Sequence, residues 1–304
     1  MQGSKLQDRE PDMERVLLRG ADEHRLCGWV RGSGPVRVVF LHGIGDHARV
    51  WDAIALALPS DICSLCVDLR GHGDSSWSQH GEYARGDFGR DVEVVLQDLG
   101  PAPIALVGHS LGAWLALRYA ALHGERLVAL ALLDVGLRVE TSVAQRLREG
   151  LVREATSFAS LESYLEHVRG RYWLAEPAAL EAFARASVRH DDELGVMPKL
   201  DPAARSVLRD RDAFGDVWAD LRRIACPTLV LRGAGSAVLS RQTAREMVDA
   251  HLPNGHLVEV PRAGHALLLD NPSETRRAVL DFLLPQLRSD AACVAEPQVQ
   301  FDAS

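Results

Sequence analysis

The stretch IALVGHSLG, residues 104–112, shows how the rest of the chain is organised. Its first four residues are apolar, as expected of a strand that is buried on both faces. A mostly apolar segment follows at 111–123 and stops at Gly124, where a helix would end. Residues 108–112 match G-x-S-x-G, the pattern of a sharp strand-to-helix turn that exposes a serine at the carboxyl end of a sheet. Ser110 is therefore the candidate nucleophile. The alternative interpretation is a tight Gly-Ser turn without chemistry.

Strands and helices alternate on both sides of this stretch. Continuous apolar segments predict strands, and apolar residues three or four positions apart predict helices. The predicted strands are 15–19, 25–30, 36–41, about 62–67, 104–107, 127–133, 227–232 and 256–260, and the predicted helices are 87–99, 111–123, 240–251 and 273–287. The first two strands read as an antiparallel pair. The whole pattern predicts an α/β fold with a mainly parallel sheet. Residues 137–224 contain no clear buried strand and are expected to form a helical insertion.

Two further motifs follow predicted strands. His42-Gly43 ends the strand at 36–41, and a backbone N–H in the loop after it can stabilise an oxyanion together with the N–H that follows the nucleophile. The expected donors are Ile44 and Leu111. His265 comes just after the last strand, within RAGHA at 262–266, where a histidine can serve as general base for Ser110. The alternatives are an ordinary strand-end glycine and a surface histidine.

Together with DLRGHGDS at 68–75, these motifs resemble the α/β-hydrolase family. The resemblance covers about 36–136 and 226–287. It implies an eight-stranded sheet, Ser110 as nucleophile, His265 as base and a cap domain over the site. The expected organisation is a disordered N-terminus at 1–13, a hydrolase core at 14–136 and 225–287, a helical cap at 137–224 and a flexible tail at 288–304. The stretch at 68–75 is usually structural in this family.

The third member of a catalytic triad is missing from its usual place. In the family the acid usually follows the strand that here reads PTLVLR, but residues 233–240 contain no carboxylate and Ala237 stands where aspartate is expected. Asp134 is the leading replacement, because it ends the strand at 127–133 and keeps the order Ser, acid, His. Two alternatives are a Ser-His dyad, which would be slow, and a degenerate protein that binds without turnover. Glu140 and Asp270 are outside candidates, and Asp270 is expected to support the turn near His265.

Substrate contacts are harder to predict. His42, Gly43, His109, Tyr172, Trp173 and Trp218 are the candidates. The insertion also contains other aromatic residues, and most of its aromatic side chains are expected to form its own core. They are Phe158, Tyr164, Tyr172, Trp173, Phe183, Phe214 and Trp218.

Composition excludes several classes of function. The formal net charge of −8 argues against a nucleic-acid-binding surface and against electrostatic attachment to anionic membranes. No metal-binding spacing, P-loop or strand-linked dinucleotide motif is present, so neither metal nor cofactor is expected. The five cysteines are interpreted as reduced thiols. The polar N-terminus does not resemble a signal peptide, which predicts a cytoplasmic location.

The sequence therefore predicts a serine hydrolase acting on a small-molecule ester, thioester or lactone, with the acid moved to the strand before the cap. Acyl transfer, cyclisation or C–C bond hydrolysis by the same triad is one alternative. A degenerate binding or scaffold protein on the same fold is the other.

Overall fold

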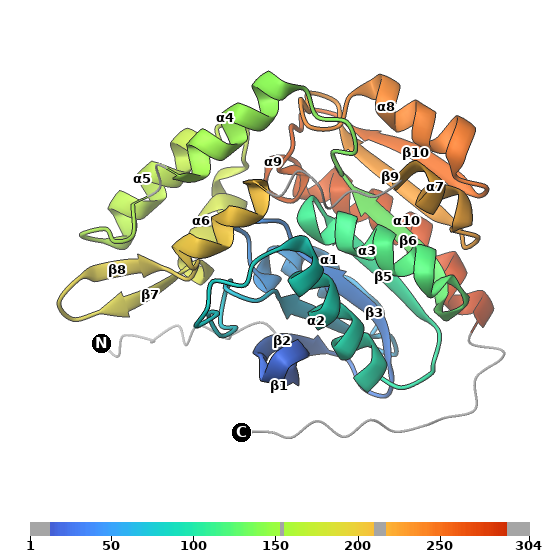
Figure 1. Ribbon diagram of the computed structural model, residues 1–304, viewed down its shortest axis with the longest axis horizontal. Coiled ribbons are helices and arrows are strands. Elements are labelled where there is room, and N and C mark those ends of the chain that lie inside the picture. Colours follow the sequence, from blue (N-terminus) through green and yellow to red (C-terminus); the bar gives the residue numbers. More distant parts are fainter. Residues whose placement is uncertain (1–12, 153–154, 210–216, 291–304) are drawn as a thin grey trace, which may run out of the picture.

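An eight-stranded sheet forms the centre of the computed structural model, which describes residues 13–152, 155–209 and 217–290 (Figure 1). Its strands are β1 Glu14–Arg19, β2 Arg25–Arg31, β3 Val36–Leu41, β4 Cys63–Asp68, β5 Ile104–His109, β6 Leu127–Leu133, β9 Thr228–Gly233 and β10 Gly255–Val260. They lie in the order β1-β2-β4-β3-β5-β6-β9-β10. β2 runs antiparallel to both of its neighbours, and the other neighbouring pairs are parallel. The predicted mainly parallel α/β fold is confirmed.

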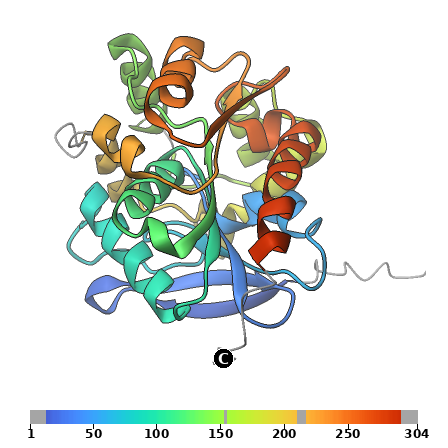
Figure 2. The same ribbon diagram turned by 90° about the vertical axis from the view of Figure 1, so that its right-hand side faces the viewer.

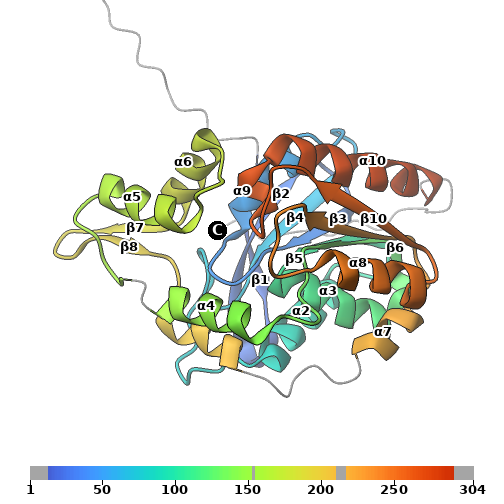
Figure 3. The same cartoon turned by 90° about the horizontal axis from the view of Figure 1, so that it is seen from above.

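Helices cover both faces of the sheet. They are α1 Asp52–Ala55, α2 Arg85–Asp98, α3 Leu111–Leu122, α7 Val217–Arg223, α8 Arg241–Glu246, α9 Leu267–Asp270 and α10 Pro272–Asp290, with short 3₁₀ turns at Ala21–Glu23, Ala48–Trp51, Gly124–Arg126 and Pro202–Arg209. Helix α10 runs along one face, and α2, α3, α7 and α8 lie on the other (Figures 2 and 3). The continuous apolar sequence of β3 follows from this arrangement, because Val39 and Leu41 face one hydrophobic cluster and Val38 and Phe40 face the other.

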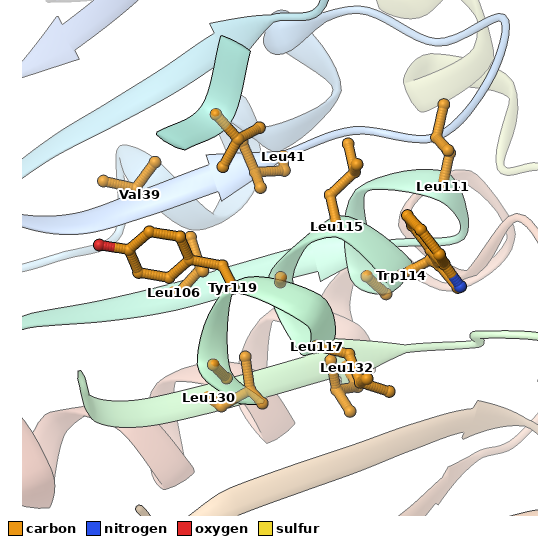
Figure 4. Packing of buried hydrophobic residues seen from close by; sticks show 14 of the residues in the cluster. Val39, Leu41, Leu106, Leu111, Trp114, Leu115, Leu117, Tyr119, Leu130 and Leu132 are labelled. Carbon is orange, nitrogen blue, oxygen red and sulfur yellow. The ribbon is translucent and has the colours of Figure 1, made fainter. Parts of the chain in front are cut away.

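Helix α3 packs directly over the middle of the sheet. Its leucine and aromatic side chains lie against alternate residues of β3, β5 and β6, including Val39, Leu106 and Leu130 (Figure 4). Burial of each such side chain contributes about 1.5–3 kcal/mol to folding. The first turn of α3, which carries Ser110 at its start, is therefore anchored on a rigid surface.

Two glycines permit the close approach of α3 to the sheet. A Cβ atom added at Gly112 would lie 2.1 Å from the Leu41 carbonyl oxygen, and one added at Gly108 would lie 2.3 Å from the Gly112 carbonyl oxygen. Both contacts are far inside van der Waals distance. The glycines of the GHSLG motif are thus required by the packing of the turn.

The inserted segment lies beside the edge of the sheet where β6 ends (Figure 1). It contains α4 Thr141–Val152, α5 Leu161–Arg171, α6 Pro177–Ala186 and a hairpin of β7 Val188–Asp191 with β8 Gly195–Pro198. The sequence predicts a helical insertion without a clear buried strand, and the structure adds this hairpin to its helices. Each of its strands has only four residues, and β7 has two exposed residues, so the sequence contains no long apolar run there.

Smaller differences concern helix ends. The predicted helix at 240–251 divides into α8 and a π-helical turn at Met247–His251. Helix α10 continues to Asp290, so residues 288–290 of the expected tail are helical. The remainder of that tail, residues 1–12 of the expected N-terminal segment, and Phe214 lie outside the described residues.

Four cysteines lie in the described part of the chain, namely Cys27, Cys63, Cys66 and Cys226, and they are buried and free of disulfides. Burial raises the pKa of the Cys63 thiol to about 11 and that of Cys66 well above its ordinary value, so both remain protonated thiols. Among the helices described, none has the length and apolar character needed to cross a membrane.

Candidate active site

Three parallel strands bring Ser110, Asp134 and His265 to one edge of the sheet. Ser110 lies between β5 and α3, Asp134 directly follows β6, and His265 lies in the loop between β10 and α9. Because parallel strands share the direction of their carboxyl ends, residues that follow them meet at the same edge. Chain segments that are 131 and 155 residues apart thereby contribute to a single site.

Ser110 has a strained backbone. Its φ of 52° and ψ of −112° are unusual for a residue with a side chain. The Ser110 N–H donates to the Leu133 carbonyl oxygen at 3.0 Å, which fixes the turn to the neighbouring strand. Such strain persists only where the surrounding structure enforces it, and it is concentrated at functional sites.

A continuous hydrogen-bonded chain joins the three side chains. His265 Nε2 lies 3.0 Å from Ser110 Oγ, and His265 Nδ1 lies 2.7 Å from Asp134 Oδ2. An ionised carboxylate can only accept, so the His265 Nδ1–H donates to Asp134 and Nε2 is left to accept the serine proton. This is the tautomer that a general base requires.

Asp134 is fully buried, and protein groups hold its carboxylate in place. Its Oδ1 accepts from the Gly233 N–H at 3.2 Å, and its Oδ2 accepts from the Ser236 hydroxyl at 2.5 Å as well as from His265. The Ser236 Oγ in turn accepts the N–H groups of Val238 and Leu239, which leaves its own proton for Asp134. The last residue of β9 and the loop after it thus each supply one donor to Asp134, where the family usually has a carboxylate in that loop. No motif in the sequence predicts this role for Ser236.

The two expected oxyanion donors come from a cavity-lining residue and from the residue that follows Ser110. Ile44 lines the cavity at the serine, and Leu111 is the first residue of α3, where an N–H has no partner within its helix. Neither N–H donates to any acceptor in the part of the chain that the structure describes. Gly43 permits this arrangement, because a Cβ there would lie 3.1 Å from the Ser110 Cβ.

His109 forms a buried ion pair with Asp46, a residue that the sequence analysis did not select. Its Nδ1 lies 3.2 Å from Asp46 Oδ2, and its Nε2 lies 2.8 Å from the His265 carbonyl oxygen. Both partners are acceptors, so both ring nitrogens carry protons and the ring is an imidazolium. Burial opposes this charge, but the hydrogen bond and charge of Asp46 outweigh it and raise the pKa of His109. Burial likewise opposes ionisation of Asp46, yet His109 lowers the pKa of that carboxyl.

Two of the predicted substrate contacts do not reach the cavity. His42 is fully buried: its Nδ1 bonds to the Gly43 carbonyl oxygen at 2.7 Å and its Nε2 accepts from the Leu69 N–H at 2.9 Å. Burial lowers the pKa of His42 to about 3, so the ring is neutral and ties two loops together. Trp218 lies on α7, where its ring contacts that of His251 at a centroid distance of 4.7 Å. Neither type of contact can be read from a sequence.

A cavity of about 710 Å³ opens at Ser110. Gly43, His109, His265 and Ala237 line it from the core, and Tyr172 and Trp173 line it from the inserted segment. Asp270 also lines it, but its Oδ2 accepts from the Gly264 N–H at 2.8 Å and so supports the turn before His265. Other aromatic residues of the insertion pack on one another, as in the contacts of Phe158 with Tyr164 and of Tyr172 with Phe183.

Among the described residues, the side chains of Cys27, Asp68 and Asp74 lie close enough together to hold a metal ion, but their chemistry does not favour one. Burial raises the pKa of Cys27 to about 11, which leaves a neutral thiol. Asp68 already accepts from the N–H groups of Ala48 and Asp74. These contacts make the stretch at 68–75 part of the structural core.

Comparisons with known proteins agree with this architecture. The sequence profile of the Alpha/beta hydrolase family matches residues 38–278. An esterase of Mycobacterium tuberculosis is 30% identical over 285 residues, covering 89% of this chain and 90% of the esterase. A pimeloyl-[acyl-carrier protein] methyl ester esterase of Chromobacterium violaceum is 31% identical over 263 residues, covering 84% and 96% of the two chains. A crystal structure of E-2-(acetamidomethylene)succinate hydrolase superposes with a TM-score of 0.79 at 25% identity, covering 89% of this chain and 98% of that one.

Proposed function

Since the chain belongs to the α/β-hydrolase family, we propose that it is a serine hydrolase that cleaves carboxylic esters or closely related thioesters and lactones. Ser110 is the nucleophile, His265 the general base and Asp134 the acid that orients His265. The hydrogen-bonded chain from Ser110 through His265 to Asp134 is the observation that carries this proposal.

The reaction proceeds in two halves. As Ser110 Oγ bonds to the carbonyl carbon, its proton passes to His265 Nε2 and the carbonyl electron pair moves to oxygen. The N–H groups of Ile44 and Leu111 stabilise that oxyanion. Collapse of the intermediate expels the alcohol or thiol, which takes the proton from His265. Water then attacks the acyl-enzyme by the same route and releases the carboxylic acid and free Ser110.

The relatives support ester hydrolysis as the first choice. Two of them are named as esterases and the compared crystal structure as a hydrolase. Acyl transfer, cyclisation and C–C bond hydrolysis would use the same residues. Ester hydrolysis ranks above them because of what these relatives are named for. A protein that only binds has no use for a strained serine joined to a buried carboxylate, both of which cost folding energy.

In this proposal the inserted segment 137–224 acts as a cap. It contributes Val143, Tyr172, Trp173 and Leu174 to the cavity around Ser110. These side chains are largely apolar, so they suit the hydrocarbon part of a small-molecule substrate and exclude water from the oxyanion.

We expect a fluorophosphonate probe to form one covalent adduct on this protein. An activated serine attacks phosphorus, expels fluoride and loses its proton to His265, whereas an ordinary serine does not react. Intact mass spectrometry should show the adduct in the wild type and not in Ser110→Ala. An adduct that persists in Ser110→Ala, or no adduct in either protein, would contradict the assignment of Ser110.

A further inference from the structure

The inserted segment places two arginines on the cavity at Ser110. Arg146 belongs to α4 and Arg171 ends α5, and both line the cavity that contains the serine. They come from two different helices, so their position on one cavity does not follow from sequence spacing. The guanidinium of Arg171 lies 5.0 Å from the centroid of the Tyr172 ring, which holds it at the cavity wall.

The carboxylates that line the same cavity are engaged elsewhere. Asp46 pairs with the His109 imidazolium at 3.2 Å, and Asp270 accepts from the Gly264 N–H at 2.8 Å. The positive charge of Arg171 helps to lower the pKa of Asp46. Arg146 forms no ion pair with any residue that the structure describes. Arg146 therefore brings to a mostly apolar cavity a positive charge that no carboxylate of the described residues pairs with. A ligand that carries a negative charge would balance it.

We propose that the substrate carries an ionised carboxylate in addition to its scissile ester, and that Arg146 and Arg171 bind this carboxylate. The inference rests on the proposed function, because it places the ester carbonyl at Ser110. Guanidinium groups present donors in a planar fork that matches the two oxygens of a carboxylate. The apolar wall of Val143, Tyr172 and Leu174 then contacts the hydrocarbon between the two ends of the substrate.

Paired esters of equal length test this inference. The mono-4-nitrophenyl ester of adipic acid ends in a carboxylate, whereas 4-nitrophenyl hexanoate ends in a methyl group at the same position. We expect kcat/KM for the adipate ester to exceed that for the hexanoate by about tenfold or more, since a charged hydrogen bond contributes that much to binding. Most of the difference should lie in KM, and it should shrink as ionic strength rises. The 4-nitrophenyl ester of 6-aminohexanoic acid, which carries a positive charge, should be the poorest of the three.

Variants assign the preference to the two arginines. In the double variant Arg146→Gln/Arg171→Gln, the ratio of the two kcat/KM values should fall to near one, and Arg146→Lys/Arg171→Lys should restore part of it. Arg169→Gln is the matched control, because this exposed arginine is on α5 but does not line the cavity. It should retain the full ratio.

The outcomes separate the inference from the proposed function. Equal kcat/KM for the two esters, or a preference that survives in the double glutamine variant, would overturn the carboxylate site while leaving Ser110 hydrolysis intact. A preference for the aminohexanoate ester would also overturn it. If neither ester is cleaved and the fluorophosphonate adduct is also missing, the proposed function fails and the inference fails with it.

Discussion

Replacing Asp134 by Asn should lower kcat by about 10⁴-fold, the effect of the same change in a model triad. An asparagine at this position can donate its amide proton to His265 Nδ1. That bond would put the imidazole proton on Nε2, where it can no longer accept from Ser110. With the amide nitrogen toward His265, the amide oxygen takes the place of Oδ1 and still accepts from the Gly233 N–H, so the variant should fold. Steady-state kcat with 4-nitrophenyl acetate, measured beside the thermal unfolding midpoint, separates the two effects.

A second substitution, in the loop after β9, makes this test more specific. β6 and β9 are neighbouring strands, and Ala237 lines the cavity together with His265. In the Asp134→Asn background, Ala237→Asp places a carboxylate where the family usually has one. We expect it to recover at least about tenfold of the lost kcat, because a triad is defined by the roles of its groups. Glu140→Gln, which changes an exposed carboxylate, should leave kcat unchanged. A wild-type kcat in Asp134→Asn would remove this residue from the mechanism and favour a Ser-His dyad.

His109 is expected to be a positioning residue, and His109→Gln should lower kcat by about 10²-fold with a smaller effect on KM. The imidazolium joins three parts of the site: it precedes Ser110, pairs with Asp46 and donates to the His265 carbonyl oxygen at 2.8 Å. Glutamine cannot donate to both acceptors in the same geometry. The base would then shift relative to the serine, while the cavity stays open to substrate.

The pH profile distinguishes this role from a merely structural one. The charged groups that act on His109 and its partner are Asp46, Asp134, His42 and Arg171, and the His265 backbone carbonyl also accepts from His109. Asp46 raises the pKa of His109 despite burial. The ion pair therefore stabilises the fold fully below the unfolded-state pKa of about 6.5, and this contribution is lost as pH rises through the higher folded-state pKa. We expect kcat to fall on that alkaline side in the wild type.

Two variants change that alkaline limb in opposite ways. It should be missing in His109→Gln, which has no group to titrate there. It should move to lower pH in Asp46→Asn, because the neutral amide no longer favours the imidazolium. An alkaline limb that stays in place in both variants, with kcat near the wild-type value, would show that His109 does not position the base.

Much of the fold could be predicted because its strands are buried on both faces. The apolar runs at β3, β5 and β6 are continuous for that reason, and each predicted strand lies within a residue or two of its observed bounds. The serine and histidine could be predicted from short motifs beside those strands. Asp134 followed from the same logic, since the end of a parallel strand fixes which edge of the sheet a residue joins.

The contacts that the sequence did not predict depend on side chains from distant segments. Asp46 and His109 are 63 residues apart, and Ser236 lies 102 residues from Asp134. No periodicity links such pairs. His42 is predicted to contact substrate but is buried. A histidine at a strand end can face the cavity or the core, and only tertiary packing decides between them. The β7–β8 hairpin escaped notice because partly exposed strands of four residues produce no apolar run.

The place of Asp134 also affects how the enzyme can change through evolution. In relatives with an acid after β9, that loop must preserve a carboxylate and cannot vary freely. In the proposed triad the acid directly follows β6, and Gly235, Ala237 and Val238 of the β9 loop line the cavity beside Ser110. Ser236 and Gly233 donate to Asp134 and the Val238 N–H bonds to Ser236, but no side chain at these three positions bonds to Asp134. They can be randomised in a library to select new substrates while the reacting groups stay as they are, so this chain is a favourable starting point for directed evolution of specificity.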